Sequence, residues 1–206
     1  MPSTPTPVHK RGAPDHPILE LFAERWSPYA FSPEPVTPED LQGVFEAARW
    51  AASSYNEQPW EFVVAPRDDE AGFARLLSLL VEPNQAWARD APVLALGLVR
   101  RAFSRNGTPN KAAEHDLGLA TANLMLEATR RGLAVHAMIG ILPERAREVL
   151  ALPDGVEAFT GLAIGHPGPA SALPDGLRAR DEAPRVRKPL EAFVFQGRYG
   201  EPAWSA

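Results

Sequence analysis

Apolar residues recur along this chain in short blocks whose spacing changes between helical and extended. Helical spacing, with apolar residues three or four positions apart, marks residues 16–26, 37–52, 68–80, 111–133 and 143–152. Extended aliphatic runs mark residues 61–66, 91–99, 134–141 and 158–166. Because helices and strands alternate without a strict βαβ repeat, the pattern predicts an α+β protein around a central sheet.

Two helices carry clear end signals. Thr37 followed by Pro38 and two acidic residues predicts the start of one helix, and Gly132 predicts the end of a long, buried central helix. The segments between elements are less regular. Residues 100–113 predict a loop or lid, residues 167–184 an excursion without its own core, and residues 189–200 an edge strand for this subunit or a neighbour.

Composition limits the function classes. The 206 residues are 45% hydrophobic, carry a formal net charge of −5 and contain no cysteine. The charge argues against nucleic acid or an anionic membrane as partner, and the missing thiols exclude disulfides, thiol catalysis and Fe–S clusters. Without an apolar stretch long enough to span a bilayer, we expect a cytoplasmic protein. Residues 1–14 read as a flexible arm and residues 15–206 as a single domain.

Motifs for other chemistries are absent from the sequence. It has no G-x-G-x-x-G, no Walker A and no H-E-x-x-H, and Ser53 and Ser54 lack a nucleophile elbow. Glu114, His115 and Asp116 are adjacent on a helix and so point in different directions, which argues against a metal site. We therefore predict no catalytic side chain and no metal.

Polar residues instead gather where predicted elements end. They follow the first helix, fill "SSYNEQ" at 53–58 and recur at Asn84, around Gly140 and at two C-terminal arginines. Each alone has a structural explanation as a cap, turn or surface charge. Together they predict a ligand site.

The blocks "RWSPYAF" and "PVTPEDLQGVFEAARWAASSYNEQPWEFVV" resemble the N-terminal signature of the nitroreductase family. "NQAWARDAPVLAL", "DLGLATANLMLEATRRGLAVHAMIGI" and "VRKPLEAFVFQGRYG" resemble its later blocks in the same order. The resemblance implies an α+β sandwich with a central, mainly antiparallel sheet flanked by helices, forming an intertwined homodimer. It also implies FMN at the subunit interface, with hydride passing in a ping-pong cycle from NADH or NADPH through FMN to a small electron-poor acceptor such as a nitroaromatic or a quinone.

The resemblance assigns cofactor contacts residue by residue. Arg25, Ser27, Arg185 and Arg187 match phosphate and ribityl contacts, and Asn84 matches an amide near the pyrimidine edge. Ser53, Ser54 and Asn56 match a loop that reaches the flavin across the interface, whereas Met138, Ile139 and Gly140 match backbone beside its dimethylbenzene and N5 side. The full predicted set is Arg25, Trp26, Ser27, Tyr29, Ser53, Ser54, Asn56, Asn84, Trp87, Met138, Ile139, Gly140, Arg185 and Arg187.

The residue types suit this cofactor on physical grounds. A phosphate favours several guanidinium groups, which Arg25, Arg185 and Arg187 can supply, because arginine donates bidentate hydrogen bonds and stays ionised. Gly140 would let the backbone approach the ring closely. Flavin chemistry needs no acid, base or nucleophile from the protein.

The chain departs from the family at two positions that are often lysine. Tyr29 and Trp87 occupy them, which should lower the flavin potential or leave charge compensation to another group. Trp87 would serve packing or contact a substrate, and Phe103 and Arg105 are candidate substrate-side residues. The alternatives are the same fold and FMN with another reaction (fragmentation, dehalogenation or dehydrogenation), a low-turnover flavin-binding protein, or an α+β protein without flavin.

Overall fold

Four antiparallel strands form one sheet in the order β1-β2-β4-β3 within the computed structural model, which describes residues 6–204. The strands are β1 (Trp60–Pro66), β2 (Val93–Arg100), β3 (Ala134–Met138) and β4 (Val156–Gly165). Val63 lies opposite Leu96, and Leu162 lies between Ala95 and Ala137. The predicted α+β class with a mainly antiparallel sheet is confirmed.

The central strand β2 is covered on both faces, which explains its uninterrupted apolar sequence. Leu94, Leu96 and Leu98 pack into the core on one face of the sheet, whereas Val93 and Ala95 pack into the core on the other. Successive side chains of a strand point to opposite faces. A strand covered on both faces therefore needs apolar residues at every position.

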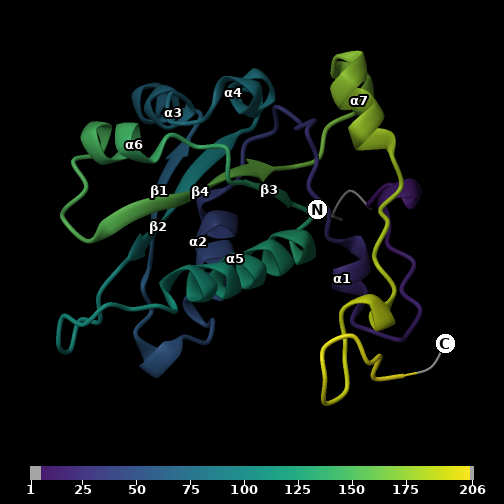
Figure 1. The fold of residues 1–206 in the computed structure, drawn as a ribbon. Coiled ribbons are helices and arrows are strands. Elements are labelled where there is room, and N and C mark those ends of the chain that lie inside the picture. Colours follow the sequence, from purple (N-terminus) through teal and green to yellow (C-terminus); the bar gives the residue numbers. More distant parts are fainter. Residues whose placement is uncertain (1–5, 205–206) are drawn as a thin grey trace.

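Helices cover both faces of the sheet (Figure 1). One layer holds α3 (Glu70–Leu77), α4 (Glu82–Ala88) and α6 (Pro143–Val149). The opposite layer holds α2 (Pro38–Arg49) and α5 (Ala113–Arg130). The sheet thus separates two hydrophobic cores.

The two predicted helix ends are confirmed by their capping bonds. The Thr37 hydroxyl accepts a hydrogen bond from the Asp40 amide at 3.0 Å at the start of α2. After α5, Gly132 has φ 74° and the Leu133 amide donates to the Ala128 carbonyl at 2.8 Å. This 6→1 bond closes a Schellman motif, which requires a left-handed residue that glycine adopts without steric cost.

Three elements differ from the expectation. The first helix, α1 (Glu20–Glu24), is shorter than residues 16–26, and Ile18 and Leu19 are exposed because no layer of this chain covers them. Residues 82–88, to which the sequence pattern assigned no element, form α4, with Pro83 in its first turn. Residues 167–184 were expected to lack a core of their own, yet α7 (Asp175–Glu182) forms there, Leu177 packs against the core of the domain, and Leu173 is buried.

Short 3-10 turns complete the chain. They are η1 (Val8–Lys10), η2 (Ser54–Asn56), η3 (Ala170–Ala172) and η4 (Leu190–Ala192). The turn η1 lies in the predicted N-terminal arm, whose residues 1–5 fall outside the described part. The division into an arm and one domain stays a prediction.

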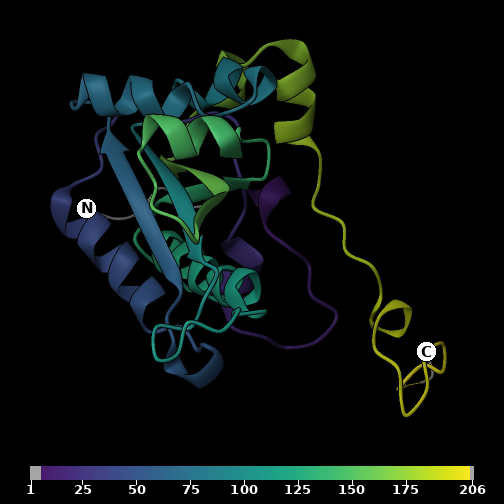
Figure 2. The same cartoon turned by 60° about the vertical axis from the view of Figure 1, so that its left-hand side comes forward.

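The C-terminal tail leaves the body of the molecule after α7 (Figure 2). It adds no strand to this sheet, which corrects one of the two expectations for residues 189–200. In the described part of the tail, up to residue 204, one isolated bridge pairs Phe195 with Pro202. Tyr199 is 94% exposed and Trp204 is 60% exposed. An edge strand for a neighbouring subunit stays a prediction. Across residues 6–204, no helix combines the length and the apolarity needed to cross a membrane.

Candidate functional site

Three arginines converge beside the end of α1. Arg25 is the residue that follows α1, and Arg185 and Arg187 lie on the segment after α7. Burial lowers the pKa of Arg25, and the charge of Arg187 lowers it further. Burial also lowers the pKa of Arg185, with added contributions from Arg25 and Arg187. Like charges held this close destabilise one another unless an anion binds between them.

Within residues 6–204, no carboxylate forms an ion pair with any of these three arginines, whereas Glu or Asp side chains pair with others such as Arg49, Arg100 and Arg131. Arg185 donates instead to the Ala23 carbonyl at 2.5 Å and to the Phe22 carbonyl at 3.3 Å, both near the C-terminus of α1. Arg25 donates to the Ser27 hydroxyl at 3.4 Å. Partly buried cations without an acidic partner are the arrangement expected of a phosphate site.

Tyr29 and Trp87 belong to a packed aromatic group. The Tyr29 ring meets the Trp87 ring edge-on at a centroid distance of 5.1 Å and the His136 ring at 4.7 Å. Trp87 is 2% exposed and also stacks with Phe31. Of the two roles expected for Trp87, packing fits this burial. Trp26 is likewise buried.

Asn84 and Gly140 lie side by side where α4 meets the end of β3. The Asn84 side-chain amide donates to the Gly140 carbonyl at 3.0 Å. A Cβ on residue 140 would stand 2.4 Å from that nitrogen, so only glycine fits without a shift. Ile139 is 67% exposed, but Met138 is buried and its side chain belongs to the core.

The predicted loop with Ser53, Ser54 and Asn56 is fixed to the N-terminal end of α5. Buried Asp116 accepts a hydrogen bond from the Ser54 amide at 3.0 Å. Ser53 accepts one from the Gln58 amide, also at 3.0 Å. Tyr55, Asn56 and Gln58 all have φ between 52° and 56°. Left-handed residues other than glycine cost energy and cluster at functional sites.

The segment predicted as a loop or lid folds back as a small hairpin against this loop. Ala102 bridges to Pro109, and the Ser104 amide donates to the Glu57 carboxylate at 2.6 Å. The Phe103 ring meets the Tyr55 ring at 5.8 Å, and the Arg105 guanidinium lies 4.3 Å from the centre of the Tyr55 ring. Phe103 and Arg105 therefore accompany the predicted site loop.

Two of the predicted groups lie toward opposite ends of α5. Ser54 is bonded to Asp116 near the start of α5, whereas Trp26 and Thr129 line one small cavity near its end. From residue 116 to residue 129 are 13 steps, which at 1.5 Å per residue is about 20 Å. Within one chain the Ser53–Asn56 loop is therefore far from the arginine cluster.

Comparisons with known proteins identify the family of this chain. The family model described as "Nitroreductase family" matches residues 22–84 and 77–166. A solved structure, "the oxidoreductase containing FMN", is 37% identical and superimposes with a TM-score of 0.87 over 92% of this chain and 96% of that one. The chain belongs to the nitroreductase family.

Two curated relatives of this nitroreductase-family chain carry functional names. The major NAD(P)H-flavin oxidoreductase of Aliivibrio fischeri is 41% identical over 87% of this chain and 98% of its own length. The FMN reductase [NAD(P)H] of Bacillus subtilis is 27% identical over 88% of this chain and 74% of its own length. The resemblance to the family is confirmed, while the roles of individual site residues stay predictions.

Sequence reasoning did not single out three residues that support this nitroreductase-type site. Lys10 and Asp181 are 5% and 2% exposed, and Asp181 accepts a hydrogen bond from the Tyr29 amide at 2.8 Å. Burial raises the pKa of Asp181 and lowers that of His136. A lysine in a Pro-rich arm and an aspartate in an unpredicted helix gave no periodic signal. Among the described residues, no group of His, Asp or Glu could hold a metal ion.

Proposed function

We propose that this nitroreductase-family protein passes a hydride from NADH or NADPH through FMN to a small electron-poor acceptor in a ping-pong cycle. Family membership and the named relatives support the enzyme class, an FMN-dependent NAD(P)H oxidoreductase. The identity of the acceptor, a nitroaromatic, a quinone or a similar small molecule, and the ping-pong order belong to the proposal. We expect the enzyme to work in the cytoplasm.

The arginine cluster is the observation that carries the proposal. Burial and the neighbouring arginine charges lower the pKa of Arg25 and of Arg185, with Arg187 contributing to both, and none of the three has an acidic partner among residues 6–204. A phosphate monoester would supply the missing negative charge and accept bidentate hydrogen bonds. FMN carries such a phosphate, so these residues fit the cofactor.

When bound, FMN supplies the hydride chemistry, and the protein supplies binding and orientation. The arginines would hold the phosphate end and Ser27 the adjoining ribityl chain. Asn84 and the backbone of residues 138–140 would face the ring, with Gly140 permitting their close approach. No side chain is required as acid, base or nucleophile.

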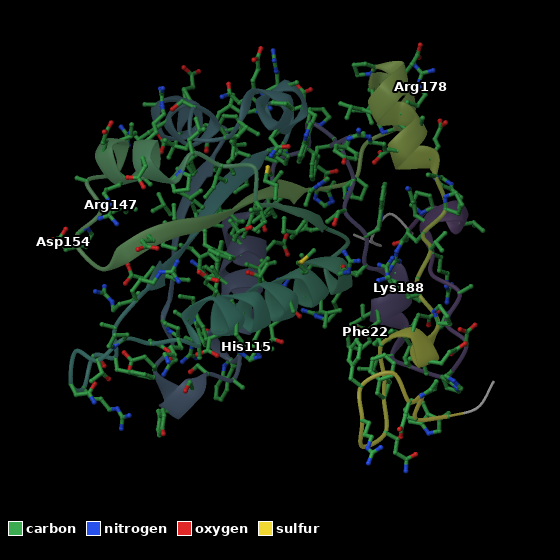
Figure 3. The ribbon with its side chains drawn as sticks, viewed as in Figure 1. Phe22, His115, Arg147, Asp154, Arg178 and Lys188 are labelled. Atoms are coloured by element: carbon green, nitrogen blue, oxygen red, sulfur yellow. The ribbon has the colours of Figure 1, made fainter. Side chains whose placement is uncertain are left out.

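A homodimer completes the proposed site. Because the Ser53–Asn56 loop lies about 20 Å along α5 from the arginine end, it would reach the cofactor of a second copy. The outward face of α5 is available for that contact. His115, Gly118, Leu119 and Ala122 share this face and are exposed, and His115 projects from it away from the sheet (Figure 3). Small residues on a helix face allow a second helix to approach closely.

Exposed apolar residues on the tail support the same assembly. Phe193, Tyr199 and Trp204 are 57%, 94% and 60% exposed, and the tail leaves its own subunit (Figure 2). Apolar side chains presented on an extended segment are typical of a surface that a partner covers. A second copy wrapped by this tail would be the intertwined dimer.

The acceptor side would involve the hairpin that contains Phe103. Phe103 meets the Tyr55 ring edge-on and the Arg105 guanidinium lies over that ring, so an aromatic acceptor could replace part of these contacts. Trp87 is too deeply buried to contact an acceptor directly.

Two anaerobic half-reactions test the proposal. FMN-loaded protein is mixed first with NADH or NADPH and then, after removal of the nucleotide, with a panel of nitroaromatics and quinones. We expect bleaching in the first step and recovery of the flavin spectrum in the second. Bleaching without recovery by any acceptor would favour the alternative reactions on the same fold, and absence of bleaching would favour a flavin-binding protein.

A further inference from the structure

The N-terminal turn η1 lies between the C-terminal end of α1 and the C-terminal end of α7. It precedes residue 22, where the family match begins. The Gly12 amide donates to the Ala23 carbonyl at 2.7 Å, and the Thr6 hydroxyl donates to the Glu24 carbonyl at 3.2 Å. These bonds fix residues 6–12 along the C-terminal end of α1, next to the arginine cluster.

Lys10 ties this turn to α7. Its ammonium donates to the Ala183 carbonyl at 2.6 Å and to the Arg180 carbonyl at 3.1 Å, which are carbonyls at the C-terminal end of α7. A cation at this position satisfies carbonyls that have no partner within the helix and interacts favourably with the helix dipole. The same ammonium lies 5.3 Å from the centre of the Trp26 ring. Lys10 is 5% exposed, so its contacts are made away from water.

The Arg185 side chain is held by the backbone carbonyl of Lys10. Its guanidinium donates to the Lys10 carbonyl at 3.1 Å and to the Ala23 carbonyl at 2.5 Å. Residue 185 follows Ala183, whose carbonyl Lys10 binds, by two positions. Lys10 thus holds both the start of the segment that carries Arg185 and Arg187 and the guanidinium of Arg185 itself.

We infer that Lys10 is a positioning residue for cofactor phosphate: it aligns Arg185, and through the segment 183–187 also Arg187, with Arg25. The inference rests on the proposed function, because it takes the arginine cluster as the phosphate site. Lys10 itself does not touch the phosphate, since its ammonium already binds two carbonyls and faces Trp26. Removing its ammonium leaves those carbonyls without a donor and frees the segment that carries the two arginines.

Binding of FMN and of riboflavin to full-length protein distinguishes positioning from general destabilisation. Riboflavin lacks the phosphate, so a variant that disturbs only the arginines weakens FMN and spares riboflavin. For Lys10→Met we expect an increase of about tenfold in the FMN dissociation constant, comparable to a misaligned charge-assisted hydrogen bond, with riboflavin affinity within about twofold. Lys111→Met, at an exposed lysine, serves as the matched control and should change neither affinity.

A double-mutant cycle with Arg185→Ala tests whether Lys10 affects FMN binding by positioning Arg185. If Lys10 acts through Arg185, the effect of Lys10→Met on FMN should shrink to about twofold or less in the Arg185→Ala background. Full additivity, or equal loss of FMN and riboflavin affinity, would overturn the inference. Should Lys10→Met fail to fold, Lys10→Arg keeps a donor for the carbonyls, and we expect it to retain most of the preference for FMN over riboflavin.

The outcomes separate this inference from the proposed function. A wild-type protein that binds FMN no better than riboflavin would refute the phosphate site, and this inference with it. A preference for FMN over riboflavin that survives in Lys10→Met, or that is lost in Lys10→Arg, would refute the role of Lys10 alone.

Discussion

The side-chain amide of Asn84 and the carbonyl of Gly140 are joined by a 3.0 Å hydrogen bond that only a residue without a Cβ permits. This bond links α4 to the end of β3 at the proposed ring-binding edge. Gly140→Ala should displace Asn84, cost about 1–3 kcal/mol of folding free energy and weaken FMN binding. Urea unfolding and FMN titration measure the two effects.

Gly176→Ala provides the matched control for this change. A Cβ at residue 176, in α7, meets nothing within 4 Å. We expect it to be neutral or to stabilise the protein by up to about 1 kcal/mol, since alanine favours a helix over glycine. A Gly140→Ala protein as stable as Gly176→Ala and with unchanged FMN affinity would show that the contact is dispensable.

Arg187→Ala tests the phosphate contact. Arg187 is exposed and lowers the pKa of both Arg25 and Arg185, so it stands near them without an acidic partner in the described chain. Its removal should weaken FMN binding by about 1.5–3 kcal/mol, the range of a charge-assisted hydrogen bond. Arg145→Ala, at another exposed arginine, should leave the affinity unchanged. Equal FMN affinities for the two variants would show that Arg187 makes no contact with the phosphate.

Leu119→Glu tests the dimer. Leu119 lies on the outward face of α5 and is 36% exposed, as is Leu142 at the start of α6. A charge on the α5 face should disrupt the proposed dimer and release FMN, because the second copy supplies the Ser53–Asn56 loop. Light scattering coupled to gel filtration reports the mass. We expect Leu142→Glu to remain dimeric, and a dimeric Leu119→Glu would refute α5 as the interface.

The pH dependence of stability should include a contribution from His136. Burial lowers its pKa below 6.5, and the Pro28 carbonyl and Asp181 only partly offset this effect. The unfolded chain therefore takes up the proton first as pH falls below 6.5, so the folded state loses stability in that window. His136→Gln should lose less stability than the wild type between about pH 7.5 and about pH 5.5.

Asp181 faces His136 and contributes in the opposite sense. Burial raises its pKa above 3.8, so the stability linked to its protonation is lost as pH rises through the folded value. The difference between the stability-versus-pH curves of His136→Gln and wild type isolates the contribution of His136, because Asp181 contributes to both curves. Exposed His16→Gln is the control, and identical pH profiles for all three proteins would contradict the assignment.

Phe103→Ala tests the acceptor side. The Phe103 ring meets Tyr55 beside the site loop, away from the arginine cluster. The variant should change the acceptor KM while leaving the rate of flavin reduction by NAD(P)H unaltered, because the two half-reactions are separated in a ping-pong cycle. Equal loss in both half-reactions would place Phe103 in the general structure of the site.

The spacing of apolar residues predicted the strands and most of the helices that cover them, because buried positions recur with the period of the element that holds them. The continuous apolar run of β2 and the Thr37 cap of α2 each reflect a local rule that tertiary structure did not override. The short helices α4 and α7 escaped detection. Neither EPNQAWA in α4 nor DGLRARDE in α7 repeats apolar residues at helical spacing, and packing rather than periodicity stabilises these helices.

The site was anticipated as a set of residue types but not as a geometry. Residues of the 53–58 loop and Arg25 lie at opposite ends of α5, which no linear pattern reports. Lys10 bonds to the carbonyls of Arg180 and Ala183, which are 170 and 173 residues away in the chain, and Asp181 accepts from the Tyr29 amide, 152 residues away. Such long-range backbone capping leaves no local sequence signal.

The most direct test of the account is the absorbance of FMN-loaded protein before and after NADH or NADPH is added under anaerobic conditions. We predict that the purified protein binds FMN and that one of the two nucleotides bleaches the bound flavin. A colourless protein that takes up no FMN, or a bound flavin that neither nucleotide bleaches, would contradict it.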